Sequence, residues 1–132
     1  MTFEIQGIDH VALAVRDVGR SAEWYQQVLG LRRLYEDAWG DFPAVVGIGG
    51  TAIALFPVQG DAPKGRPGRD TLALRHLAFR VDAPNFAKAR QALEGRGIAV
   101  EFQDHGIAQS IYFHDPDGHE LEITTYELQS WK

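Results

Sequence analysis

The chain has 132 residues, a formal net charge of −5 and no cysteine, and hydrophobic residues make up 45% of it. This length suits one compact domain, and the apolar share is enough to form a core. The acidic balance disfavours nucleic acid as a partner, because phosphate binding needs a basic face, and the lack of cysteine excludes disulfides and thiolate metal ligands. No apolar run could span a membrane and the first residues lack the pattern of a secretory signal, so we expect a cytoplasmic protein.

The first half of the chain predicts a strand, a helix and three more strands. Residues 7–15 alternate as a half-buried strand does. Asp17–Leu29 carries apolar residues at helical spacing, and Gly30 ends that helix. The turn pairs Gly40-Asp41 and Gly49-Gly50 separate the three remaining strands, which we expect at 31–38, 42–48 and 51–58.

The second half repeats this order after a linker at residues 59–71 that is rich in glycine and proline. A strand is predicted over 73–81 and a helix over 84–94, with a proline in its first turn. Three strands follow, at 98–104, 109–114 and 119–127. The chain therefore predicts a single α+β domain, 1–132, of two tandem β-α-β-β-β modules at about 5–58 and 72–128.

A basic segment, Lys64–Arg69, lies within the linker. Its glycines and proline indicate a loop. We consider two roles for it, a solvated linker or a lid over an anionic ligand.

Two segments, Ile8–Val15 and Leu74–Val81, repeat one pattern: a short apolar run with a histidine near its start, then an acidic residue and a helix. The repeat places His10 and His76 at equivalent positions of two units that pack together. Because successive side chains of a strand point to opposite faces, both histidines are expected on the face away from the helices.

The same parity argument assigns further side chains to that face, namely Arg80, Tyr112, Glu122 and Tyr126, whereas Glu120 is left out on parity. Two histidines and one carboxylate match the facial triad that holds a divalent metal and leaves positions open for substrate. The alternative is two buried histidines, with the glutamate paired to an arginine such as Arg80.

These two segments and Tyr112–Glu122 resemble the vicinal oxygen chelate superfamily, which includes glyoxalase I, extradiol dioxygenases, methylmalonyl-CoA epimerase, and fosfomycin and bleomycin resistance proteins. The resemblance covers nearly the whole chain. It implies paired βαβββ modules in a curved, barrel-like mixed sheet around a metal cleft, with helices outside. It also implies a small-molecule substrate, a homodimer and a divalent metal (Fe(II) favoured; Mn, Zn, Ni or Co possible) bound by His10, His76 and Glu122.

Within the superfamily, the extradiol dioxygenases match one stretch best. His105, Ile111-Tyr112, the Asp115–Gly118 turn and Glu122 follow their spacing, which implies that His105 and Tyr112 act on substrate oxygens of a catecholic or phenolic compound. Arg80, Tyr126 and Trp39 are further candidates for contacting substrate. The acid–base histidine that those enzymes carry late in the first half has no counterpart here, since no histidine lies between His10 and His76.

Two alternatives stay open. A glyoxalase- or epimerase-like lyase or isomerase would use a first-half carboxylate, where this chain has Ala54. A drug- or metabolite-binding resistance protein would act without catalysis. Fosfomycin-modifying enzymes are disfavoured, because Ala12 replaces their hydroxyl residue and residues 101–110 contain no lysine or arginine.

Overall fold

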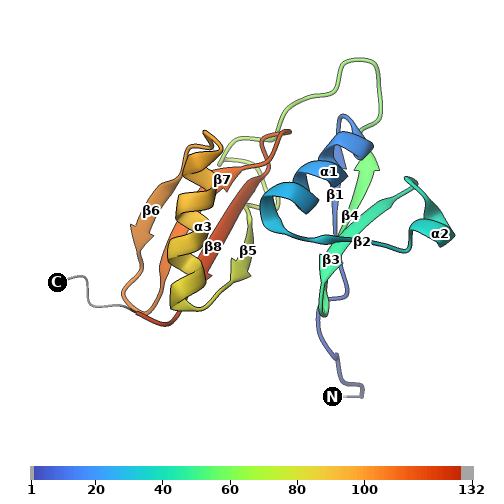
Figure 1. The fold of residues 1–132 in the computed structure, drawn as a ribbon. Helices are drawn as coiled ribbons and strands as arrows, with labels where there is room; N and C mark the ends of the chain where they lie inside the picture. The colour runs from blue at the N-terminus through green and yellow to red at the C-terminus, as the bar shows by residue number, and fades with distance from the viewer. Residues whose placement is uncertain (1, 129–132) are drawn as a thin grey trace. The chain divides into compact units, whose positions relative to one another are not determined.

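The computed structural model describes residues 2–128 (Figure 1). The chain divides into two compact units, Met1–Pro63 and Lys64–Lys132. Each unit holds one four-stranded mixed sheet with a helix across one face. The predicted α+β class and the two tandem modules are thereby confirmed. Within the described residues neither sheet closes on itself, since each has two edge strands.

The first unit contains four strands, one long helix and one helical turn. In chain order these are β1 (Val11–Val15), α1 (Val18–Leu29), β2 (Arg32–Leu34), α2 (Glu36–Trp39), β3 (Ala44–Ile48) and β4 (Thr51–Pro57). The strands lie in the order β1-β4-β3-β2. The last strand returns to pair in parallel with the first, while the other pairs are antiparallel.

The second unit repeats this topology without the extra helical turn. Its elements are β5 (Leu77–Arg80), α3 (Ala83–Gly95), β6 (Glu101–Asp104), β7 (Gln109–His114) and β8 (Glu120–Thr125). The strand order is β5-β8-β7-β6, and β5 and β8 are again the parallel pair. The two units are therefore copies of one supersecondary motif.

Both long helices begin at the acidic residue that follows the first strand of their unit. The Asp17 carboxylate accepts a hydrogen bond from the backbone N–H of Arg20 at 3.0 Å, and Asp82 does the same for Asn85 at 3.0 Å. Such caps satisfy N–H groups that the first turn leaves unpaired. Gly30 ends α1 in the left-handed conformation, with a φ of 69°, which glycine adopts without a steric penalty.

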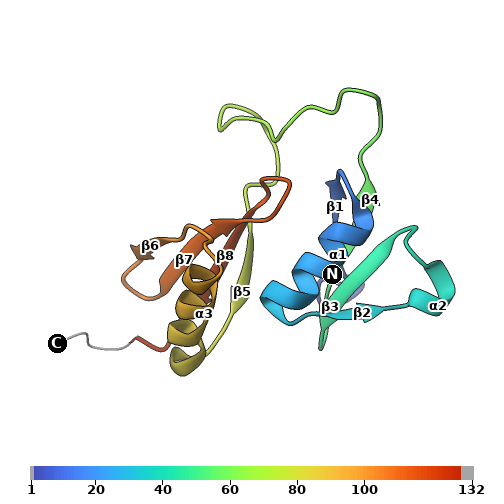
Figure 2. The same cartoon turned by 45° about the horizontal axis from the view of Figure 1, so that its top comes forward.

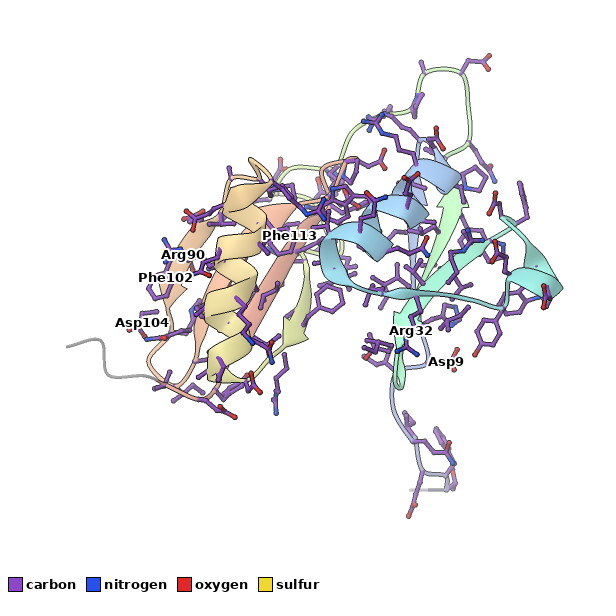
Figure 3. The ribbon with its side chains drawn as sticks, in the orientation of Figure 1. Asp9, Arg32, Arg90, Phe102, Asp104 and Phe113 are labelled. Carbon is purple, nitrogen blue, oxygen red and sulfur yellow. The ribbon has the colours of Figure 1, made fainter. Side chains whose placement is uncertain are left out.

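Each helix lies across the sheet of its own unit (Figure 2), and its buried side chains face that sheet. In the first unit Ala22 and Tyr25 of α1 are fully buried, as the helical spacing predicted. In the second, Phe86 and Leu93 of α3 are buried with the strand side chains that alternate towards the helix, which are Ile111, Phe113, Leu121 and Ile123. Where α3 meets β6, the Arg90 guanidinium lies 5.6 Å from the centre of the Phe102 ring (Figure 3).

The strand predicted over 31–38 is only partly correct. Pairing with β3 ends at Leu34, because Tyr35 takes a left-handed conformation with a φ of 57° and turns the chain into α2. Residues 7–15 and 73–81 are also shorter as strands than predicted. Their parallel ladders begin only at Val11 and Leu77. Among residues 2–128, the structure has no helix long and apolar enough to span a membrane.

A substitution at Gly47 tests how tightly β3 packs against β4. A Cβ at this position would lie 2.3 Å from the backbone oxygen of Thr51 and 2.9 Å from Cδ1 of Leu34. We expect Gly47→Ala to lower the free energy of unfolding by about 1–3 kcal/mol, measured by urea denaturation. Gly50→Ala is the control, because nothing lies within 4 Å of a Cβ there. Equal stability of the two variants would contradict this packing.

Candidate functional site

The parallel pairing of first and last strands aligns the two units residue by residue. Ala12 pairs with Ala54 in the first unit, and Ala78 pairs with Glu122 in the second. Ala54 therefore occupies the position equivalent to Glu122, as the repeat indicated. The first unit has a histidine before its first strand but no carboxylate at this position of its last strand.

In the second unit, His76 and Glu122 lie in direct contact. Nε2 of His76 is 2.9 Å from Oε1 of Glu122, whose side chain is 9% exposed. The Ser110 hydroxyl donates to the other carboxylate oxygen at 2.5 Å and lies 3.0 Å from Oγ1 of Thr124. Thr124 in turn donates to the backbone oxygen of Gln109 at 3.3 Å. Both oxygens of this buried carboxylate are thus held in fixed directions.

The alternative in which Arg80 pairs with Glu122 between buried histidines is wrong. The Glu122 carboxylate contacts His76 and Ser110, whereas the Arg80 guanidinium lies over the Tyr126 ring at 4.6 Å. The histidine side chains are accessible, since those of His10 and His76 are 51% and 33% exposed. Arg80 and Tyr126, both predicted to contact substrate, contact each other.

The exclusion of Glu120 on parity is also wrong. Residues two apart in a strand share a face, and Oε1 of Glu120 lies 3.6 Å from Nδ1 of His76. In the first unit, Nδ1 of His10 lies 2.8 Å from Oδ2 of Asp9. Each predicted ligand histidine therefore has a carboxylate on its Nδ1 side. In metal sites such a carboxylate orients the ring so that Nε2 faces the ion.

His105 and Tyr112, which the resemblance to extradiol dioxygenases implied as site residues, are hydrogen-bonded to each other. Nε2 of His105 is 3.0 Å from the Tyr112 hydroxyl, and the Tyr112 and His76 rings meet edge to face with centres 5.6 Å apart. Partial burial raises the pKa of Tyr112 above its usual value, and the negative charge of Glu122 is the second cause, in the same direction. The phenol therefore stays protonated at neutral pH, so it has a proton to donate.

A cavity of about 340 Å³ opens within the second unit beside these side chains. Its lining includes His76 and Tyr112 from the predicted face, Glu120, and Arg69 and Arg75 from the segment before β5. This volume suits a small molecule. The two arginines were not predicted as site residues, although the basic linker, considered as a lid over an anionic ligand, was a signal for Arg69.

The donor types and spacing of His76 and Glu122 fit a divalent metal. Two ligand atoms bound at right angles, each about 2.1 Å from an ion, lie about 3 Å apart, close to the observed 2.9 Å. Within residues 2–128 no three His, Asp or Glu side chains are assembled into a metal-holding group. The third predicted ligand, His10, belongs to the other unit, so the complete set stays a prediction.

Trp39 also lies in the first unit, at the end of α2. The residue is 52% exposed and its ring centre lies 5.2 Å from that of Tyr35. Its predicted contact with substrate stays a prediction.

Arg66 anchors the linker to the segment that leads into His76. Its guanidinium donates to the backbone oxygens of Leu74 at 2.9 Å, Arg75 at 2.7 Å and Gly118 at 3.4 Å. A planar guanidinium has enough donors in a rigid fork to join three carbonyl groups. The conformation just before β5 therefore depends on a residue ten positions upstream of His76.

We expect Arg66→Ala to loosen this segment, because three carbonyl groups lose a charged donor. Amide hydrogen exchange of residues 74–77 should accelerate, and the free energy of unfolding should fall by about 1–2 kcal/mol. Lys64→Ala, which removes a neighbouring exposed cation, is the control. Exchange that is equally fast in both variants would show that Arg66 does not hold the segment.

Sequence comparison matches residues 7–123 to the model of the Glyoxalase/Bleomycin resistance protein/Dioxygenase superfamily. The metallothiol transferase FosB of Staphylococcus saprophyticus is 31% identical over 128 residues, which cover 95% of this chain and 80% of that protein. The catechol-2,3-dioxygenase of Bacillus subtilis is 27% identical over 117 residues, 88% of this chain but only 40% of that enzyme.

Among solved structures, a glyoxalase/dioxygenase from Nostoc punctiforme superposes with a TM-score of 0.73 at 29% identity. The match covers 91% of this chain and 90% of that one.

Proposed function

This chain belongs to the Glyoxalase/Bleomycin resistance protein/Dioxygenase superfamily, and we propose that it is a metal-dependent enzyme that acts on a small substrate through two neighbouring oxygen atoms. The observation that carries this proposal is the contact between Glu122 and His76, a residue that lines a cavity of about 340 Å³. The enzyme names of the relatives support it.

His76, Glu122 and His10 are the proposed ligands. A divalent ion held there, with Fe(II) favoured, would supply Lewis-acid chemistry and open positions for substrate oxygens and dioxygen. Ser110 fixes the carboxylate of Glu122, and Glu120 and Asp9 orient the two imidazoles. In this proposal His10 comes from the first unit of the same chain or, in the homodimer that the family resemblance implies, from the first unit of a second copy.

Ring-opening dioxygenation of a catecholic or phenolic compound is the reaction we propose. For a catechol, both atoms of dioxygen enter the product and no reductant is needed. The Tyr112 hydroxyl donates a hydrogen bond to a substrate oxygen, and His105, 3.0 Å away, accepts the proton that the bound catechol loses and returns it to the ring-opened product. This pair supplies the acid–base group that the first half lacks.

Thiol transfer to a small electrophile is the second candidate. It is favoured by the similarity to the metallothiol transferase, whose aligned region covers 80% of that protein, against 40% for the catechol dioxygenase. A lyase or isomerase remains less favoured, because Ala54 stands opposite Ala12 where a second carboxylate would be needed. A binding protein without catalysis would have no use for the paired His76 and Glu122.

Metal content tests the ligands without reference to activity. We expect chain purified without chelator, or loaded anaerobically with Fe(II), to retain a divalent ion after gel filtration. Removing one ligand should weaken the affinity at least about tenfold, so His76→Ala and Glu122→Ala should lose the ion. His119→Ala is the control, because it removes a histidine outside the proposed set. Equal metal content in all four proteins would refute the ligand assignment.

Oxygen consumption separates the two candidate reactions. With Fe(II) and a panel of catechols, we expect oxygen uptake that falls about 10²–10⁴-fold in His105→Gln or Tyr112→Phe, while metal content is unchanged. The same preparations are given low-molecular-weight thiols and fosfomycin, and loss of free thiol is followed. Thiol loss without oxygen uptake would overturn the dioxygenase proposal in favour of transfer.

A further inference from the structure

Two arginines in the cavity beside His76 have no anionic partner. Arg69 and Arg75 line both that cavity and an adjoining one of about 200 Å³. Among the described residues, neither guanidinium forms an ion pair, although the chain carries 18 acidic residues against 13 basic ones. A cleft lined by unneutralised charges of one sign raises the local concentration of ions of the opposite sign, so two unpaired arginines at one cavity suggest an anionic ligand.

The acidic side chains of the same cavity have other partners. Glu120 lies 3.6 Å from Nδ1 of His76, and Glu101 accepts a hydrogen bond from the Gln103 amide at 3.4 Å. Neither lies within ion-pair distance of Arg69 or Arg75. The positive charge at this end of the cavity is therefore not neutralised by the carboxylates that share it.

The backbone that carries Arg75 is also held in place. Arg66 donates to the backbone oxygen of Arg75 at 2.7 Å, and Arg66 itself lines the adjoining cavity. Arg75 and His76 both line the cavity of about 340 Å³, so one ligand in it can contact both residues. Guanidinium groups bind carboxylates and phosphonates through paired hydrogen bonds, which makes two of them suitable for a small oxyanion.

We propose that Arg69 and Arg75 form an anion subsite, which binds a carboxylate or phosphonate on the substrate or co-substrate. This inference rests on the proposed function, because it places the anionic group beside the proposed metal ligand His76. The substrate class is then a small organic acid that carries two metal-binding oxygens. The basic linker is accordingly a wall of the ligand cavity, in line with the lid considered from its sequence.

Calorimetric titration of the full chain tests this subsite without turnover. The probes are 3,4-dihydroxybenzoate and catechol, which differ only in the carboxylate, and inorganic phosphate as a tetrahedral oxyanion. We expect the acid to bind about ten- to a hundredfold more tightly than catechol. This preference should shrink as sodium chloride is added. Tighter binding of 3,4-dihydroxybenzoate than of catechol indicates that the subsite takes a carboxylate. If the two bind equally and phosphate binds, the subsite takes a phosphonate.

Arg69→Gln and Arg75→Gln should each reduce the preferred binding about tenfold or more, and Arg75→Lys should restore part of it. Lys88→Gln on α3 is the control with the same charge change, and circular dichroism confirms that each variant folds. Equal binding of all probes, or anion binding that the double variant retains, would overturn the subsite.

These outcomes are separable from those of the proposed reaction. If 3,4-dihydroxybenzoate binds more tightly than catechol but no catechol of the panel supports oxygen uptake, the dioxygenase proposal is refuted and the subsite is supported. Oxygen uptake with no anion preference refutes the subsite alone.

Discussion

Parallel pairing of the first and last strands of each unit is the constraint on which the site depends. Because β8 returns beside β5 with Leu77 opposite Leu121, a residue just before the first strand lies at the level where the last strand begins. His76 therefore meets Glu122 and Glu120, which are far from it in sequence. The connection between β5 and β8, which contains α3, β6 and β7, makes this return possible, since parallel strands need a long crossover.

The two units share a backbone but differ in chemistry. Each places a histidine before its first strand and a carboxylate beside that ring, yet the last strand carries alanine in one copy and glutamate in the other. The second unit also holds the cavity, the His105–Tyr112 pair and the unpaired arginines. One copy of the motif thus carries most of the polar groups of the candidate site, while the other has His10 beside Asp9.

Much of this could be predicted from the sequence, because strand and helix periodicities are local. The buried face of α1 and the equivalence of Ala54 with Glu122 both followed from spacing. The helical turn α2 did not, since it depends on the left-handed Tyr35. Arg69 and Arg75 lie in a segment whose path is set by tertiary contacts. Strand and helix periodicities do not predict such a path.

The Arg66 contacts also determine where the chain can be lengthened. Residues 59–63 precede the anchor, whereas 67–73 lie between the guanidinium and the carbonyl groups that it holds. Added residues before the anchor extend a tether and leave the cavity wall intact. The same insertion after it would enlarge a closed loop and move Arg69 relative to His76. For an engineer who joins, splits or circularly permutes the two halves, the usable junction is therefore the short stretch before Lys64.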